Sequence, residues 1–184
     1  MNAVLHRLLI AAGLLLTLGA VNVTVWQREQ LIDSGQVVML ELAPVDPRSL
    51  MQGDYMALRF SLSRDVLPDN AMARPRRAGE PAEWFASDGY VVVKRDARNI
   101  GKFARLWREG ETLAADESRI RYRVREQNVR IVTNAWFFKE GTGTVFTPAR
   151  YGELRVADNG EALLVAMRDK DLQLLQVESK KSKP

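Results

Sequence analysis

Very few side chains of this 184-residue sequence could carry catalytic chemistry. It has no cysteine, which excludes disulfides, zinc–thiolate sites and thiol nucleophiles. The one histidine, His6, precedes an apolar run, so a domain further along the chain lacks imidazole as general base or metal ligand. A Ser-His-Asp triad therefore cannot be built within the chain. We expect no cofactor, no metal site and no enzyme activity.

A row of arginines is the strongest local concentration of charge. Residues Arg119 to Arg125 read R-I-R-Y-R-V-R, and in a strand this alternation places all the arginines on one face. One hypothesis is contact with anionic lipid or an envelope polymer. The interpretation we favour is a solvated strand face whose arginines pair with acids from a neighbouring strand. The four arginines are Arg119, Arg121, Arg123 and Arg125.

The net charge of the chain is small. It amounts to +4, from 27 basic and 23 acidic residues, and the basic residues are spread along the chain. A nucleic-acid-binding protein has a denser basic patch. We therefore expect no nucleic-acid partner.

A second candidate site is the segment Leu42–Phe60, which reads LAPVDPRSLMQGDYMALRF. Two prolines and a polar turn lead into Gly-Asp-Tyr, which opens an alternating strand. We favour a structural role, in which the turn starts a strand that buries alternate residues. A ligand or partner site is the other interpretation. Its residues would be Asp46, Pro47, Arg48, Gly53, Asp54, Tyr55, Leu58 and Phe60.

Residues Gly53–Phe60, GDYMALRF, resemble the pattern that gives the GDYXXLXY family its name, with phenylalanine in place of the final tyrosine. Ala43–Arg48, Trp136–Gly141 and Arg150–Val156 also resemble segments of that family. The resemblance implies a membrane-anchored bacterial protein without an established activity, acting as an accessory partner of a multi-pass membrane protein.

The Gly-Asp pair before an apolar strand also resembles serine–lysine peptidases of the signal-peptidase type, which need no histidine. Such a hydrolase would use Ser49 as nucleophile and Lys94 or Lys102 as a desolvated base. Val45 stands where that pattern has its serine, and Ser49 is closer to the Gly-Asp pair than the pattern allows. A hydrolase, or a degenerate relative of one, remains the alternative function.

A membrane segment is predicted at the N-terminus. Leu8–Trp26 is 19 residues long and uncharged, and a helix rising about 1.5 Å per residue would nearly cross the ~30 Å hydrocarbon core. We expect residues 1–30 to be an uncleaved signal anchor, with a cleaved signal peptide as the alternative. Arg7 favours a cytoplasmic N-terminus, which places a single-pass protein in the inner membrane with its domain in the periplasm.

The remainder reads as one β-rich domain over residues 31–178, with a disordered basic tail at 179–184. The Pro-rich stretch at 63–88 is predicted to be a mobile loop or to hold a short helix near Pro81–Ala86. About eight short strands favour a small barrel or sandwich, and Thr147–Tyr151 is predicted as a helical turn. The expected strands are Val37–Leu42, Tyr55–Leu62, Tyr90–Lys94, Phe103–Trp107, Arg119–Arg125, Val129–Phe138, Leu154–Val156 and Ala162–Met167.

Overall fold

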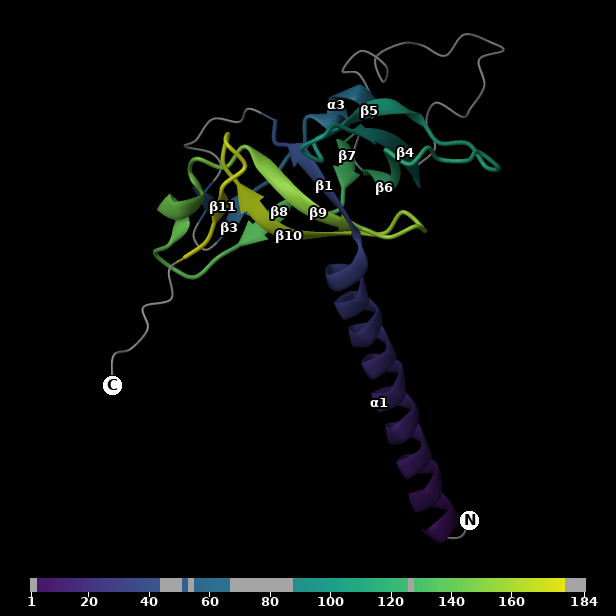
Figure 1. The fold of residues 1–184 in the computed structure, drawn as a ribbon. Coiled ribbons are helices and arrows are strands. Elements are labelled where there is room, and N and C mark those ends of the chain that lie inside the picture. Colours follow the sequence, from purple (N-terminus) through teal and green to yellow (C-terminus); the bar gives the residue numbers. More distant parts are fainter. Residues whose placement is uncertain (1–2, 44–50, 53–54, 67–87, 126–127, 178–184) are drawn as a thin grey trace.

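The computed structural model of the protein describes residues 3–43, 51–52, 55–66, 88–125 and 128–177. One long helix leads into a domain built mostly of strands, which sits across the end of the helix (Figure 1). The prediction of an N-terminal helix followed by a mainly-β domain is confirmed. The predicted tail and most of the predicted loop lie outside the described residues.

Helix α1 spans Ala3–Ser34 and contains the predicted membrane segment. It extends beyond residue 30 because Leu31 is buried against the domain. The helix ends at Gly35, whose N–H donates to the carbonyl of Leu31 at 3.0 Å. A side chain on Gly35 would collide with that same carbonyl oxygen, so glycine permits the chain to turn directly into the first strand.

One curled sheet has the order β1-β9-β10-β11, with every neighbouring pair antiparallel. The predicted strand Val37–Leu42 and the predicted final hairpin are therefore confirmed. The turn of that hairpin needs Gly160, which has a φ of 88° and whose Cβ would overlap the ring of Tyr90. The strands are β1 Gln36–Glu41, β9 Tyr151–Val156, β10 Ala162–Arg168 and β11 Leu174–Leu175.

A second curled sheet has the order β5-β4-β6-β7, again antiparallel. Main-chain hydrogen bonds join it to the first sheet: Met39 N–H donates to Asn99 O at 2.7 Å, and Arg121 N–H to Gly160 O at 3.0 Å. The two half-barrels thus enclose a common core. The strands are β4 Asp88–Arg95, β5 Gly101–Leu106, β6 Glu117–Arg125 and β7 Asn128–Ile131.

A small third sheet, β2-β3-β8, contains the beginning of the Gly-Asp-Tyr strand. The predicted strand Tyr55–Leu62 is too long, because pairing beyond Ala57 is limited to a single bridge at Phe60 and helix α3 starts at Leu62. Leu62 and Val66 are both buried and lie four residues apart, which is the spacing of one helix face. The elements are β2 Met51–Gln52, β3 Tyr55–Ala57, β8 Ala135–Phe137 and α3 Leu62–Val66.

Two further predictions need correction. The single strand expected at Val129–Phe138 is two strands in different sheets, β7 and β8, separated by Val132 with a φ of 59°. The helical turn expected at Thr147–Tyr151 lies earlier, as the 3-10 helix η2 at Gly143–Phe146.

The core has two clusters, and alternate residues of the motif strand reach both. Phe60 belongs to the cluster between the half-barrels, whereas Met56 and Leu58 pack in a smaller cluster with Phe146. A Cβ on Gly152 would lie 2.9 Å from the ring of Phe60, so the two segments with family resemblance pack on each other. The favoured structural role, a strand that buries alternate residues, fits this arrangement.

Candidate functional site

The exposed face of β6 forms the centre of the candidate site. Arg121, Arg123 and Arg125 all point to the carboxylate of Asp88 on the neighbouring strand β4, at 3.9, 3.4 and 3.6 Å. The prediction that a neighbouring strand supplies the acid is confirmed for these three arginines and is wrong for Arg119, which has no acidic partner among the described residues. The acid itself was missed, because Asp88 was placed at the end of the predicted loop and is instead the first residue of β4.

On the other side of β6 the arginines face a fourth positive charge. The antiparallel register places Arg130 of β7 directly opposite Arg123. Like charges at opposed positions of a sheet are destabilising. Within the described part of the chain, no acidic side chain forms an ion pair with Arg130. Counted over the described residues, the arginines of this face therefore outnumber the carboxylates beside them.

Helix α1 supplies a fifth arginine. Arg28 reaches Glu161, at the start of β10, with an Nη1–Oε2 distance of 3.4 Å. Arg28 and Glu161 line the same hollow as the arginines of β6 and β7, with a volume of about 430 Å³. We call this hollow the arginine groove. Its lining residues are Arg28, Arg121, Arg123, Arg125, Arg130, Val132, Thr133, Asn134, Glu161 and Ala162.

The structure separates Arg119 from the other three arginines of the predicted row. The guanidinium of Arg119 lies 4.9 Å from the ring centroid of Trp107 and 5.4 Å from that of Tyr90, and its Nε donates to Asp158 O at 2.9 Å. Stacked cation–π contacts of this kind stabilise the fold. Arg119 therefore has a structural environment, and only the other three reach the groove.

The described motif residues have two kinds of surroundings. Leu58 and Phe60 are buried, whereas Tyr55 is half-buried and its ring centroid lies 5.8 Å from that of Phe137, which is 74% exposed. Asp46, Pro47, Arg48, Gly53 and Asp54 lie outside the described residues.

A second hollow connects the motif strand to the arginine groove. It has a volume of about 310 Å³ and is lined by residues 57–60, by α3 and by β7. Arg130, Thr133 and Asn134 line both hollows. The motif and the arginine face, which are far apart in sequence, are thus neighbours in the fold.

Val132 joins these two regions in an unusual backbone conformation. Its φ of 59° is disfavoured for a β-branched residue and costs on the order of 1–3 kcal/mol. The bend lets the chain leave β7 and enter β8 in another sheet, and Val132 lines the arginine groove. Sequence reasoning missed this bend because valine is typical of continuous strands.

The two lysines of the hydrolase hypothesis, Lys94 and Lys102, do not lie in a desolvated site. Lys94 and Lys102 are opposite each other on β4 and β5, and both are exposed. Lys94 also pairs with Asp116 at 3.4 Å. A catalytic lysine needs the opposite environment, one that excludes water. Ser49 lies outside the described residues.

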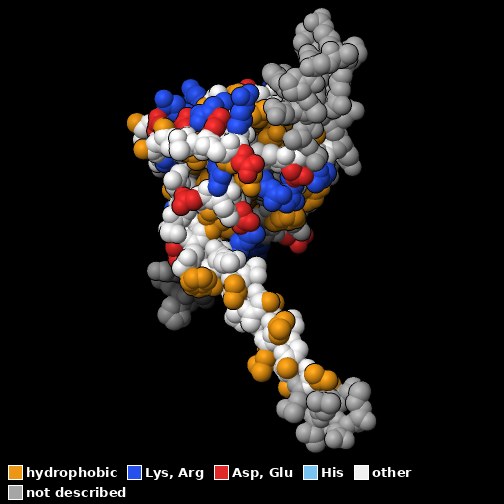
Figure 2. All heavy atoms as spheres, turned by 90° about the vertical axis from the view of Figure 1, so that its right-hand side faces the viewer, with side chains coloured by type: hydrophobic (Ala, Val, Ile, Leu, Met, Phe, Trp, Pro, Cys, Tyr) orange, Lys and Arg blue, Asp and Glu red, His pale blue; other side chains and the backbone are white. Residues whose placement is uncertain are grey.

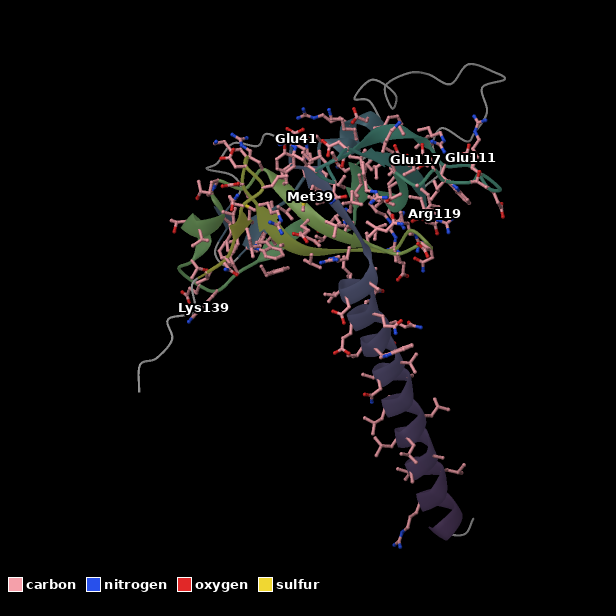
Figure 3. All side chains as sticks on the ribbon, in the orientation of Figure 1. Met39, Glu41, Glu111, Glu117, Arg119 and Lys139 are labelled. Carbon is pink, nitrogen blue, oxygen red and sulfur yellow. The ribbon has the colours of Figure 1, made fainter. Side chains whose placement is uncertain are left out.

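A second charged cluster, the Arg105 cluster, lies at the far end of β5 and β6. Arg105 is held by Glu117 at 2.6 Å and by Glu111 at 3.1 Å. The hydrogen bond that Glu117 accepts from Arg105 is the main cause that holds the pKa of Glu117 below its usual range, and the hydrogen bond from the amide of Ala114 is the second cause. Figure 3 shows Glu111 and Glu117 at the same edge of the domain as Arg119.

No metal site is visible in the described ranges, where no group of three His, Cys, Asp or Glu side chains is placed to hold an ion. The arrangement suits binding of an anion by guanidinium groups, which pair bidentately with phosphate or carboxylate.

Comparison with known proteins gives a family and no further relatives. A model of the family described as "GDYXXLXY protein" matches residues 17–167. No curated protein and no solved structure matches the chain. The matched residues include the motif strand, the second half-barrel, the first half-barrel up to Met167 and every residue of the arginine groove. The chain belongs to the GDYXXLXY protein family.

Proposed function

We propose that this protein is a single-pass, membrane-anchored binding module that docks on an integral membrane protein and has no catalytic activity of its own. The observation that carries the proposal is helix α1. Residues Leu9–Ser34 form a helix that is long and apolar enough to cross a membrane, and none of its most apolar 18 residues is buried against the domain. Figure 2 shows its hydrophobic side chains open on the visible face. Such a surface needs a bilayer or another apolar partner.

The short connection between the anchor and the domain supports a position of the domain close to the membrane surface. Leu31 is buried against the domain, and Arg155 donates to the carbonyl of Gly35 at 3.4 Å. There is no linker, because β1 starts at Gln36. From Trp26 to Ser34 the helix rises about 12 Å at 1.5 Å per residue. The domain would therefore rest against the headgroup layer.

The orientation follows from the flanking charges. Arg7 and the N-terminal amine precede the apolar segment, whereas Arg28 is the single basic residue in the 20 residues that follow Trp26. An excess of basic residues favours the cytoplasmic side. We infer a cytoplasmic N-terminus, with the domain in the periplasm of a bacterium that has an outer membrane.

The exposed face of the small sheet is the docking surface that we favour. Phe137 lies on β8, an edge strand of that sheet, and its ring stands beside Tyr55 of the motif. Exposed aromatic pairs are enriched where proteins associate. The nearby Lys139 lies at the lower margin of the domain, close to the level of the last turns of α1 (Figure 3). An extramembrane segment of a membrane protein could reach this face.

A photocrosslinking amino acid at Phe137 tests the docking proposal in cells. We expect a crosslink to one multi-pass membrane protein, and its loss when Tyr55→Ser is added. The matched control carries the crosslinker at Phe103, an exposed aromatic on β5 in the other half of the domain. Crosslinks only to lipid at position 137, or the same protein captured from position 103, would contradict the proposal.

Topology and catalysis have separate tests. A reporter fused after Pro184 should be active in the periplasm, and cytoplasmic activity would overturn the orientation. The alternative hydrolase predicts that Ser49→Ala abolishes the cellular phenotype, whereas a binding module predicts that this variant behaves as wild type.

A further inference from the structure

We propose that the arginine groove binds the phosphate of anionic lipid headgroups. The inference rests on the proposed membrane crossing of α1, and it concerns a different surface from the docking face at Phe137. It names a ligand class, the phosphodiester of a headgroup such as that of phosphatidylglycerol, and the residues that would hold it.

The first support is the charge balance. The groove contains five arginines, Arg28, Arg121, Arg123, Arg125 and Arg130, and the acidic partners that they have among the described residues are Asp88 and Glu161. The four ion-pair distances lie between 3.4 and 3.9 Å, and the four arginines that make them have side chains 45–55% exposed. These guanidinium groups are loosely paired and keep donors available. A bound phosphate would supply the missing negative charge.

The second support is the sheet register. Alternate residues of a strand are about 7 Å apart, so Arg121, Arg123 and Arg125 form a row on one face of β6. Arg130 of β7 stands opposite the middle of that row, where a like charge is unfavourable. Several guanidinium groups therefore converge on one hollow, the geometry that binds phosphate oxygens. An anion there would relieve the repulsion between Arg123 and Arg130.

The third support is the position of the groove relative to the anchor. Arg28 follows Trp26 by two residues, which is about 3 Å along the helix axis. Tryptophan at the end of a membrane-spanning segment marks the interface, so Arg28 lies at the depth of lipid phosphates. The ion pair of Arg28 with Glu161 ties the groove to that depth. Figure 2 shows basic and acidic side chains together on the domain just above the helix.

This position favours a lipid over a soluble polymer. A polymer reaches any exposed surface of the domain, whereas a headgroup reaches only groups near the end of the apolar helix. The groove includes Arg28, the first arginine after the uncharged segment Leu8–Trp26 of that helix. The stacked Arg119 lines a different hollow and would not contribute.

The test uses the full chain in neutral detergent micelles and native mass spectrometry. Equimolar phosphatidylglycerol and phosphatidylcholine with the same acyl chains compete for the protein, and the ratio of bound lipids is measured. We expect wild type to prefer phosphatidylglycerol. Replacing three arginines (R121Q/R123Q/R125Q) should reduce that preference on the order of tenfold to a hundredfold, since each basic residue near an anionic surface contributes about fivefold.

A matched control removes three positive charges elsewhere. Arg98, Lys102 and Arg108 are exposed on β4–β5 and its flanking turns, outside the groove. The variant R98Q/K102Q/R108Q should keep the wild-type preference. Circular dichroism spectra that match wild type would exclude unfolding as the cause of any loss. Added salt should weaken the preference, because exposed charges are screened.

Two soluble probes separate the lipid from other sources of phosphate. Glycerol 1-phosphate and polyphosphate are each titrated against the protein without added lipid. Weak binding of both, with retained preference for phosphatidylglycerol, supports the lipid headgroup. Tight arginine-dependent binding of glycerol 1-phosphate or of polyphosphate without a lipid preference would overturn it, in favour of a free phosphate or a polymer.

The proposal also fails if wild type shows no preference, if R121Q/R123Q/R125Q retains it, or if the control variant loses it equally. None of these outcomes bears on docking, because the micelle contains no partner protein. Conversely, loss of the crosslink at Phe137 would leave the lipid preference unchanged. The two proposals therefore fail independently.

Discussion

Two arginine clusters on the same sheet have opposite charge balance. In the Arg105 cluster one guanidinium is held by two carboxylates, at 2.6 and 3.1 Å. In the arginine groove three guanidinium groups share Asp88 at 3.4 Å or more, and Arg130 adds a further positive charge. Among the described residues, carboxylates outnumber the guanidinium in the first cluster, whereas arginines outnumber carboxylates in the second.

The difference shows how to separate structural charge from binding charge. A satisfied cluster contributes to folding and shifts the pKa of its members, as Glu117 shows. A cluster whose positive charges outnumber its negative charges lowers the stability of the fold, because like charges repel. A bound ligand of opposite charge relieves that repulsion. Charge density in the sequence does not distinguish the two, since arginines occur in both.

If the core holds the domain together, both clusters should be minor terms in stability. Phe60→Ala sets the scale: Phe60 is 1% exposed and packs between the half-barrels. Removing such a ring costs about 3–5 kcal/mol. Urea unfolding in micelles should show this loss. A smaller loss than in variants of either charged cluster would contradict a core-dominated fold.

The second-largest effect is expected in the Arg105 cluster. Because the pKa of Glu117 is lowered in the folded state, its ion pair stabilises the fold above the ordinary value of 4.5. That contribution is lost as pH falls below 4.5 and through the folded pKa. In Arg105→Gln the folded and unfolded pKa values should approach each other. We expect a Tm lower by a few degrees at neutral pH and a weaker dependence on acid.

Circular dichroism melts at neutral and acidic pH measure that prediction. The control is Arg108→Gln, which removes an exposed arginine three residues away. Identical acid dependence in wild type and Arg105→Gln would show that the cluster is not structural. Lipid preference should be unchanged in both variants.

The sequence predicted the strand that carries the arginines, but it did not predict which residues lie beside that strand in the fold. The alternation from Arg119 to Arg125 was sufficient to predict a strand with one buried face, because side chains alternate across a sheet. It could not show that Arg130 stands opposite Arg123, since register depends on the length of the turn and the packing of both strands.

The remaining site residues depend on tertiary contacts. Arg28 reaches the groove only because α1 docks on β9 and β10, and Asp88 only because β4 starts earlier than its apolar residues suggest. The break at Val132 has no local signal, because tertiary packing imposes a φ that valine avoids. The local sequence was therefore sufficient to predict the strands, whereas the residues of the arginine groove could be identified only from the three-dimensional structure.

Removal of the shared acid should strengthen the groove as a ligand site. In Asp88→Asn the three arginines lose their common partner. The preference for phosphatidylglycerol should rise about fivefold, the effect of one elementary charge near an anionic surface. Stability without lipid should fall by roughly 0.2–1 kcal/mol, because arginine repulsion is no longer offset. An unchanged preference would mean that the groove does not bind the headgroup.

The last variant should show effects of the same size as Asp88→Asn but with both signs reversed: higher stability and weaker binding. Arg130→Gln removes the like charge opposite Arg123. Without lipid it should raise the free energy of unfolding by roughly 0.2–1 kcal/mol. The same variant should lower the preference for phosphatidylglycerol about fivefold, because one basic residue is gone. Replacing a purely structural arginine should instead lower stability and leave lipid binding unchanged, as we expect for Arg105→Gln. If Arg130→Gln lowered stability and left lipid binding unchanged, as Arg105→Gln should, both clusters would be structural. That result would contradict lipid binding in the arginine groove.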